Sequence, residues 1–180
     1  MSQLNCCLVV LAGPPGSGKT TWARRNGVGA VHVSQDDLID AITPAAFEHI
    51  YRPVYRAAED AVARAALERG HVVIVDRTNR TRVHRERWLN IARALHCPAV
   101  AVVMTTPPAL CRSRNRERAG HRRVSEERMD RMFAAMQPVS VLEGFSAIYL
   151  GEAITMDEIL AQLRAPERED IAHEHCHQAR

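Results

Sequence analysis

One lysine stands among 23 arginines in this chain, and it lies inside a glycine-rich loop. The loop fits the phosphate-binding pattern G-x-x-x-x-G-K-[ST] at every fixed position. Its residues are Gly13, Pro14, Pro15, Gly16, Ser17, Gly18, Lys19 and Thr20. In such loops the backbone N–H groups surround phosphates, the lysine reaches the β- and γ-phosphates, and the following hydroxyl binds Mg²⁺. The pattern therefore predicts a site for a nucleoside triphosphate and Mg²⁺, with Thr21 as a further nucleotide contact.

A pair of acids follows the second apolar run, in the sequence Ser34-Gln35-Asp36-Asp37. Ligands gather at the carboxyl ends of parallel strands, so these acids are expected on the same edge of the sheet as the phosphate loop. One of them can accept the proton of an attacking hydroxyl group, as phosphoryl transfer to an alcohol requires. The other interpretation is that both acids cap the helix that runs toward Ile42.

The strongest apolar run ends at a third polar cluster, Asp76-Arg77-Thr78-Asn79. A carboxylate at this point can hold Mg²⁺ through water, which makes Asp76 a candidate metal residue. The short side chains of Thr78 and Asn79 can form hydrogen bonds with the transferring phosphate or with the acceptor. Asp and Asn also favour ordinary turns, so it is the combination with the phosphate loop that favours a functional interpretation.

An arginine-rich segment forms the fourth cluster. Its sequence is Arg112-Ser113-Arg114-Asn115-Arg116-Glu117-Arg118. On a helix, Arg114 and Arg118 share one face, whereas Arg112 and Arg116 share another. One pair can therefore point at phosphates while the other meets solvent or acids. Guanidinium groups at a γ-phosphate stabilise the charge of the transition state, and a mobile lid is the expected carrier.

Charge is distributed unevenly along the chain, whose formal net charge is +3. Residues 77–131 hold 14 arginines against five acids, a local balance of +9, so the remainder carries −6. A basic block on an otherwise acidic globule suits a phosphate-rich ligand, either a nucleotide alone or a nucleotide plus nucleic acid. For any single arginine, a solvated ion pair on a helix face is the other interpretation.

The elements that must position these clusters alternate between strand and helix patterns. Apolar runs predict strands over residues 6–12, 30–33, 71–75 and 99–104. Helical spacing predicts a helix that begins near Lys19, helices over residues 47–69, 81–95 and 107–118, and a last helix that starts at Ser125. This alternation predicts an α/β fold in which helices cover both faces of a central parallel sheet.

Length and composition indicate one compact domain. With 180 residues, of which 46% are hydrophobic, the chain can bury a core without disulfides or metals. We assign residues 1–164 to this domain, with a lid at about 107–124, and expect a flexible, histidine-rich tail over residues 165–180, for which metal binding is the alternative. The chain shows neither a membrane span nor a signal peptide, so we expect a cytoplasmic protein. The five cysteines lack C-x-x-C spacing and are expected to be buried free thiols.

Four segments together resemble the kinase domain of polynucleotide 5′-hydroxyl kinases, within the small P-loop kinases. They are GPPGSGKTTWAR (Gly13 to Arg24), HVSQDDL (His32 to Leu38), VVIVDRTN (Val72 to Asn79) and RNRER (Arg114 to Arg118). The segment LEGFSAI (Leu142 to Ile148) is similar to the closing segment of the repair-type members. The resemblance implies a P-loop kinase fold with an arginine-bearing helical lid, ATP and Mg²⁺ as cofactors, and a 5′-hydroxyl DNA or RNA end as acceptor.

The resemblance also implies roles for individual residues. Lys19 and Thr20 become the phosphate and Mg²⁺ residues, and Asp36 becomes the general base. Arg114 and Arg118 become the catalytic arginines of the lid. Asn115 is expected among the nucleotide contacts, and the expected acceptor contacts are Asp37, Tyr55, Arg77, Thr78 and Asn79.

The acceptor is the least defined part of the predicted site. Some family members carry an arginine three residues after the general base to hold an internucleotide phosphate, and Ile39 occupies that position here. Tyr51 and Tyr55 lie one helical turn apart and could stack a base, or form a stripe that is half core and half solvated. A small-molecule hydroxyl is the main alternative acceptor, and a nucleotide-dependent switch is a third reading. Separate end-processing enzymes are expected partners, and the sequence leaves the oligomeric state open.

Overall fold

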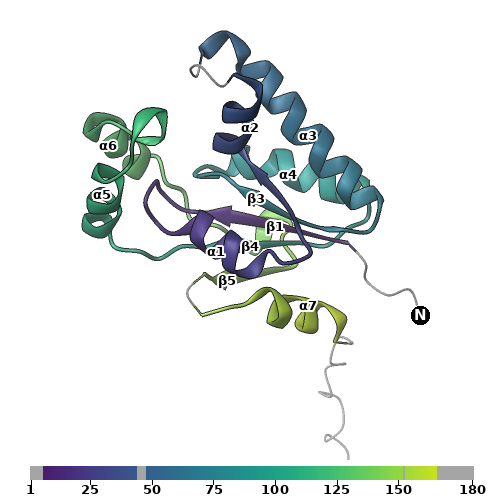
Figure 1. The fold of residues 1–180 in the computed structure, drawn as a ribbon. Helices are drawn as coiled ribbons and strands as arrows, with labels where there is room; N and C mark the ends of the chain where they lie inside the picture. Colours follow the sequence, from purple (N-terminus) through teal and green to yellow (C-terminus); the bar gives the residue numbers. More distant parts are fainter. Residues whose placement is uncertain (1–5, 44–47, 152, 166–180) are drawn as a thin grey trace, which may run out of the picture.

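Five parallel strands form one sheet in the order β2-β3-β1-β4-β5 (Figure 1). This computed structural model describes residues 6–43, 48–151 and 153–165. The strands are β1 (Cys7–Ala12), β2 (Val31–Ser34), β3 (Val72–Asp76), β4 (Ala99–Val103) and β5 (Ala147–Leu150). The expected α/β fold with a central parallel sheet is confirmed.

Helices cover both faces of the sheet, as expected. The α-helices of the described residues are α1 (Lys19–Asn26), α2 (Gln35–Ile42), α3 (Arg52–Glu68), α4 (Arg82–Ala94), α5 (Pro108–Arg116), α6 (Glu126–Ala134) and α7 (Met156–Arg164). Three short 3-10 helices accompany them, namely η1 (His49–Tyr51), η2 (Gly120–Arg122) and η3 (Val141–Glu143). Apolar side chains of α3 and α4 pack on one face of the sheet, and those of α1 and α7 pack on the other (Figure 1). None of the described helices is long and apolar enough to cross a membrane.

The register of the central strands brings the polar clusters together. All six residues of β1 are buried, because the strand has a neighbour on each side and helices on both faces. Leu11 of β1 lies opposite Asp76 of β3, and Asp76 lies opposite Ser34 of β2. The three segments that follow these strands therefore leave the sheet at the same edge, which is where the site forms.

Most predicted elements are present, with shifts of one or two residues at their ends. The predicted start of the third helix at Phe47 lies outside the described residues, and α3 begins at Arg52. Strand β5 was not predicted, because it is a short edge strand that no fully buried residue marks. Helix α7 was also not predicted, although Thr155 and Glu158 form a capping box that marks its start.

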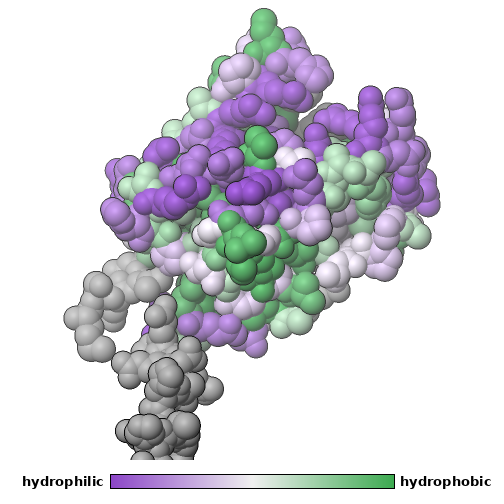
Figure 2. Space-filling model, turned by 180° about the vertical axis from the view of Figure 1, so that it is seen from behind, coloured by the Kyte–Doolittle hydropathy of each residue, from purple (hydrophilic) through white to green (hydrophobic). Residues whose placement is uncertain are grey.

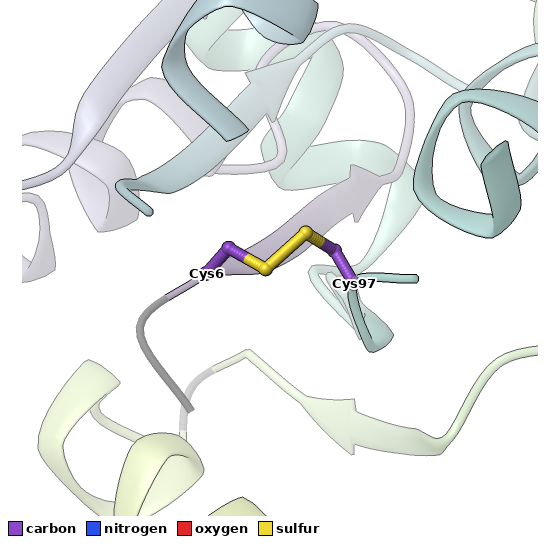
Figure 3. The surroundings of a disulfide bond; sticks show 2 residues. All are labelled: Cys6 and Cys97. Atoms are coloured by element: carbon purple, nitrogen blue, oxygen red, sulfur yellow. A yellow bond between two sulfur atoms is a disulfide. The ribbon is translucent and has the colours of Figure 1, made fainter. Parts of the chain in front are cut away.

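The expectation that all cysteines are free thiols is wrong for two of them. Cys6 and Cys97 form a disulfide across 91 residues of sequence (Figure 3). The bond is possible because the N–H of Leu8 donates to the carbonyl of Pro98 at 2.9 Å, which aligns the starts of β1 and β4. Cys7 and Cys111 are free and buried as expected, and burial raises the pKa of Cys7 to about 12. The remaining cysteine, at position 176, lies outside the described residues.

A fully buried arginine ties α4 to the segment that follows α6. The guanidinium of Arg85 forms a two-pronged ion pair with Glu143, from Nη2 to Oε1 at 2.6 Å and from Nε to Oε2 at 2.7 Å. It also donates to the carbonyls of Asn79, Gln137 and Pro138. Every donor of the guanidinium is thus satisfied, which is what makes a buried arginine tolerable.

We expect Arg85→Met to lower the free energy of unfolding by about 3–5 kcal/mol, because the carboxylate of Glu143 would remain buried without its partner. Urea denaturation followed by circular dichroism would measure the loss. Arg93→Met is the matched control, since Arg93 is an exposed arginine of the same helix. A loss for Arg85→Met no larger than that of the control would contradict the assignment.

Candidate active site

The phosphate loop has the backbone of an anion-binding cradle. It runs from the end of β1 to the first turn of α1, and Gly16 and Gly18 adopt φ angles of 80° and 94°, which favour glycine. The side chain of Lys19 is buried, and its Nζ donates to the carbonyl of Pro14 at 2.8 Å and to Oγ of Ser17 at 3.4 Å. The lysine side chain is therefore held over the loop by two other residues of the loop. Phosphate oxygens could replace these two contacts when a nucleotide binds.

Gly16 also allows the lid to rest on this loop. A Cβ atom at Gly16 would lie 2.3 Å from the carbonyl oxygen of Cys111 in α5. A second contact lies just before this helix, where Oγ1 of Thr106 donates to the carbonyl of Ser17 at 2.9 Å. The loop and the first lid helix thus meet backbone to backbone, with no room for a larger residue at position 16.

The two predicted metal residues lie together. Thr20 donates a side-chain hydrogen bond to Asp76, and His32 lies 3.3 Å from Oδ2 of the same carboxylate. Burial by itself raises the pKa of Asp76, but the hydrogen bonds from His32 and Thr20 and the charge of Lys19 outweigh it, so the pKa is lowered. Asp76 is therefore an anion at neutral pH.

This pair fits Mg²⁺, which prefers one or two carboxylates together with substrate phosphates and water. Thr20 would contribute its hydroxyl and Asp76 its carboxylate. Among the described residues, no group of three or more His, Cys, Asp and Glu side chains is arranged to hold a metal by itself. The donor set is thus that of a metal that arrives with a nucleotide rather than of a closed protein site.

Asp36 is exposed on the first turn of α2, on the rim of the site. Burial lowers the pKa of Lys19, and the negative charges of Asp76 and Asp36 partly oppose this effect, which places Asp36 within electrostatic range of the lysine. The cap of α2 is Ser34, whose hydroxyl accepts from the N–H of Asp37 at 3.3 Å. Because Ser34 caps the helix through its side chain, the carboxylate of Asp36 remains available for chemistry.

Residues 108–134, which comprise α5, η2 and α6, lie where a lid was predicted at about 107–124 and extend past it (Figure 1); we refer to them as the lid. Helix α5 ends at Arg116, so Arg112, Arg114 and Arg116 lie on it, whereas Arg118, which was expected on the same helix, follows its end. Arg114 faces the phosphate loop and donates to the carbonyl of Gly16 at 3.4 Å. Arg118 lies close enough to Lys19 to lower its pKa. On the other face, Arg112 pairs with Glu126 and Asp130 of α6, and Arg116 pairs with Glu126.

Two predicted ligand residues form hydrogen bonds within the scaffold, and one of them, Asn79, also lines the same cavity as Lys19. Asn79 is buried; its Nδ2 donates to the carbonyl of Leu11 at 2.7 Å, and its Oδ1 accepts from Nε1 of Trp88 at 3.2 Å. Asn115 is also buried and exchanges two hydrogen bonds with the backbone of Val124, which closes the lid on itself. An amide can pair with other groups of the protein as well as with a ligand, and both of these amides pair within the protein.

The predicted stacking role of Tyr55 is also not supported. Its side chain is fully buried in α3, and its hydroxyl meets that of Thr43, so no base can reach the ring. Tyr51, one turn earlier, is exposed. The alternative of a stripe divided between core and solvent is the one observed.

Three expected acceptor contacts lie at the site or beside it. Thr78 is half-buried and lines the cavity. Arg77 lines it too, but its guanidinium is engaged by Glu59 at 2.6 Å and by Gln35 at 2.8 Å. Asp37, on α2, pairs with Arg122 of the lid at 3.0 Å. Of the predicted nucleotide contacts, Thr21 is exposed on the first turn of α1.

Sequence reasoning missed a buried carboxylate that organises the wall of the site. Glu59 of α3 is fully buried, and its Oε2 accepts from Arg77 at 2.6 Å and from Arg87 at 2.9 Å. His32 and Arg122 were also missed. A glutamate inside an otherwise alanine-rich helix face was the available signal for Glu59, whereas nothing local in the sequence marks the other two.

A cavity of about 690 Å³ connects the phosphate loop with Asp36, Asp76 and part of the lid. It extends from Lys19 and Thr20 past Asp36 and Asp76 to the wall formed by α3 and α4, and the lid covers it. Two carboxylates and nine arginines line it; the arginines are Arg52, Arg56, Arg77, Arg80, Arg87, Arg118, Arg122, Arg128 and Arg131. From behind, the surface is mostly hydrophilic, and its outline is notched between the lid and the arm of α2 and α3 (Figure 2).

We expect nucleotide affinity to fall as the pH rises above 8. Burial lowers the pKa of Lys19 from its ordinary value to about 8, so the free protein loses this charge in that range. Phosphates bind the protonated form, so the affinity for MgATP should fall by about tenfold per pH unit above that point. Calorimetry in two buffers of different ionisation enthalpy would show the proton taken up on binding. Lys19→Met should bind more weakly with a flat pH profile; a flat profile in the wild type would contradict the prediction.

Comparison with known proteins agrees with this architecture. A model of the AAA domain family matches residues 8–139, more than half of the chain. A provisionally assigned kinase from Chloroflexus aurantiacus J-10-fl has a TM-score of 0.68 and 15% identity, with 91% of this chain and 96% of that one covered. A chain of the Pnkp1/Rnl/Hen1 RNA repair complex has a TM-score of 0.63 and 22% identity, with 72% of this chain but only 43% of that one covered.

A third similar structure contains a nucleotide. The APS kinase CysC of Mycobacterium tuberculosis, in complex with AMPPNP and APS, has a TM-score of 0.54 and 16% identity, with 87% of this chain and 94% of that one covered. At these identities the solved structures show the fold, and the family match assigns the sequence. The chain belongs to the AAA domain family, and its fold is that of the P-loop kinases.

Proposed function

We propose that the protein transfers the γ-phosphoryl group of ATP to the 5′-hydroxyl end of a DNA or RNA strand. The observation that carries this proposal is the arginine-lined cavity, which continues from the phosphate loop past Asp36 to a basic wall. A cavity with nine arginines and two carboxylates suits an acceptor that is itself rich in phosphate.

In this mechanism the side chains move one proton and neutralise charge. Asp36 accepts the proton of the acceptor hydroxyl as its oxygen attacks the γ-phosphorus in line, and the bond from that phosphorus to the bridging oxygen of ADP breaks. Lys19, Arg114 and Arg118 stabilise the charge on the phosphate oxygens as the bond breaks. Thr20 and Asp76 would hold Mg²⁺, which would supply further charge neutralisation. The lid excludes water, which would otherwise compete with the acceptor.

The basic wall supports a nucleic-acid acceptor. Arg56, Arg77 and Arg80 surround His84, whose pKa is lowered first by burial and then by these positive charges. Among the polar side-chain atoms buried in the described residues, those without a hydrogen-bond partner are Nε of Arg80 and Oε1 of Glu59. Glu59 neutralises part of this positive charge by pairing with Arg77 and Arg87, and a further anion near Arg56 and Arg80 would reduce the remaining repulsion. A phosphodiester strand would supply that anion, and separate end-processing enzymes would be suitable partners, as in the repair complex of the similar structure.

A small-molecule hydroxyl is the second candidate acceptor. Ile39 presents an apolar, nearly buried side chain to the cavity from the helix that carries Asp36. An apolar surface at this point would suit the body of a small alcohol or nucleoside better than it would suit a phosphate.

One labelling experiment separates the candidates. The protein is incubated with γ-labelled ATP, Mg²⁺ and 5′-hydroxyl oligonucleotides, with nucleosides and small alcohols in parallel. Label on the oligonucleotide, absent from a matched 5′-phosphate oligonucleotide and weakening steeply with salt, is the expected result. Label only on a small molecule would show that the protein is a small-molecule kinase. ATP hydrolysis without any labelled acceptor would favour a nucleotide-dependent switch.

A further inference from the structure

A single lid arginine bridges the gap between the lid and helix α2. Nη2 of Arg122 lies 3.0 Å from Oδ1 of Asp37 and also forms a short hydrogen bond with Oδ2 of Asp40. Asp37 and Asp40 are one turn apart on α2, so their carboxylates repel each other unless a cation lies between them. The two hydrogen bonds raise the pKa of Arg122, that to Asp40 contributing most.

The backbone of the same residue reaches the catalytic part of the lid. The carbonyl of Arg122 accepts from Nη1 of Arg118 at 3.5 Å. Arg118 in turn acts electrostatically on Lys19 of the phosphate loop. A continuous set of contacts therefore runs from the acids of α2 through Arg122 to Arg118, which lines the same cavity as Lys19.

The acids at the other end of this set belong to the helix that carries the candidate general base. Asp36 immediately precedes Asp37 on the first turn of α2. The rest of the lid reaches the phosphate loop through Arg114 and the backbone of Cys111, which lie on the nucleotide side of the cleft. The contacts of Arg122 thus join the lid to the acceptor side of the same cleft.

We propose that Arg122 is a positioning residue, which bridges Asp37 and Asp40 to hold the lid closed with Arg118 over the phosphate loop. This inference rests on the phosphoryl transfer proposed above. It gives Asp37 a role in lid closure rather than in direct acceptor binding. Because all three charged side chains are partly exposed, the bridge is screened by salt and can open between turnovers.

The activity test uses the full chain and three variants. Arg122→Gln is expected to lower kcat for transfer to a 5′-hydroxyl oligonucleotide roughly tenfold, because each exposed ion pair contributes little and two are lost. Its thermal midpoint should match that of the wild type. Reversal of the pair, Arg122→Asp with Asp40→Arg, should restore most of kcat, which a merely structural role would not predict. Arg123→Gln, an exposed neighbour, is the control and should leave kcat unchanged.

A distance measurement keeps the inference separate from the proposed function. Spin labels at Arg24→Cys in α1 and Glu117→Cys after α5 report lid position, with Cys176→Ser to remove a competing thiol. The wild-type background should give one narrow distance distribution, and Arg122→Gln a broader one that the charge reversal narrows again. Identical distributions in all variants would overturn the inference. If the distances respond but no acceptor is phosphorylated, the bridge stands and the proposed function fails.

Discussion

Replacing Asp36 with asparagine is expected to lower kcat for phosphoryl transfer by about 10²–10⁴-fold, the range typical of a lost general base. An amide oxygen cannot take the proton of the acceptor hydroxyl at neutral pH. ATP affinity should change little, because Lys19 and the loop backbone hold the phosphates and Asp36 lies on the rim. Single-turnover kinetics together with calorimetric binding of MgATP would separate the two effects.

Asp37→Asn is the matched control, because it removes the neighbouring carboxylate from the same helical turn. Its loss should be about tenfold or less, the cost of weakening an exposed ion pair with Arg122. Near-normal transfer by Asp36→Asn would sink the assignment of the base. A larger loss for Asp37→Asn than for Asp36→Asn would move the role to Asp37.

Lys19→Arg is expected to lower kcat/KM for ATP by about 10²–10³-fold, as does removal of a preorganised charge-stabilising donor elsewhere. Nζ of Lys19 is enclosed within 2.8 Å of the carbonyl of Pro14, and the side chain is only 7% exposed. A planar guanidinium is wider than an ammonium group and cannot occupy the same enclosure without displacing the loop.

Lys19→Met distinguishes shape from charge, because its chain is of similar length but uncharged. If charge alone matters, arginine should rescue much of what methionine loses. If the shape of the space around Nζ also matters, both variants should lose kcat/KM to a similar extent, which is the expected result. Wild-type kcat/KM in Lys19→Arg would show that the lone lysine of the chain has no special role.

The sequence predicted well those parts of the site whose geometry is local. The phosphate loop is contiguous, so its residue spacing alone sets the backbone cradle around Lys19. Asp36 and Asp76 could be placed because they follow parallel strands, whose carboxyl ends meet at one edge of the sheet. The division of the lid arginines into two faces follows from helical geometry and is seen in the ion pairs of Arg112.

Partners that are distant in sequence could not be predicted. Glu59 meets Arg77 across 18 residues and Arg87 across 28, and Arg122 meets Asp37 across 85. The sequence shows that a buried charged residue requires a partner of opposite charge, but only the folded structure shows which residue that partner is. The same ambiguity applies to Asn79, because the type of side chain does not show whether an amide binds a ligand or a neighbouring group of the protein.

The Cys6–Cys97 bridge divides the chain into a covalently closed ring and an arm that continues after it. The ring, residues 6–97, contains the phosphate loop and the two acids of the site, Asp36 and Asp76, whereas the whole lid belongs to the arm. A single cut in the backbone within the ring would leave its two ends linked through sulfur. A cut between Cys97 and the start of α5 would instead break the covalent connection between the lid arginines and the phosphate loop.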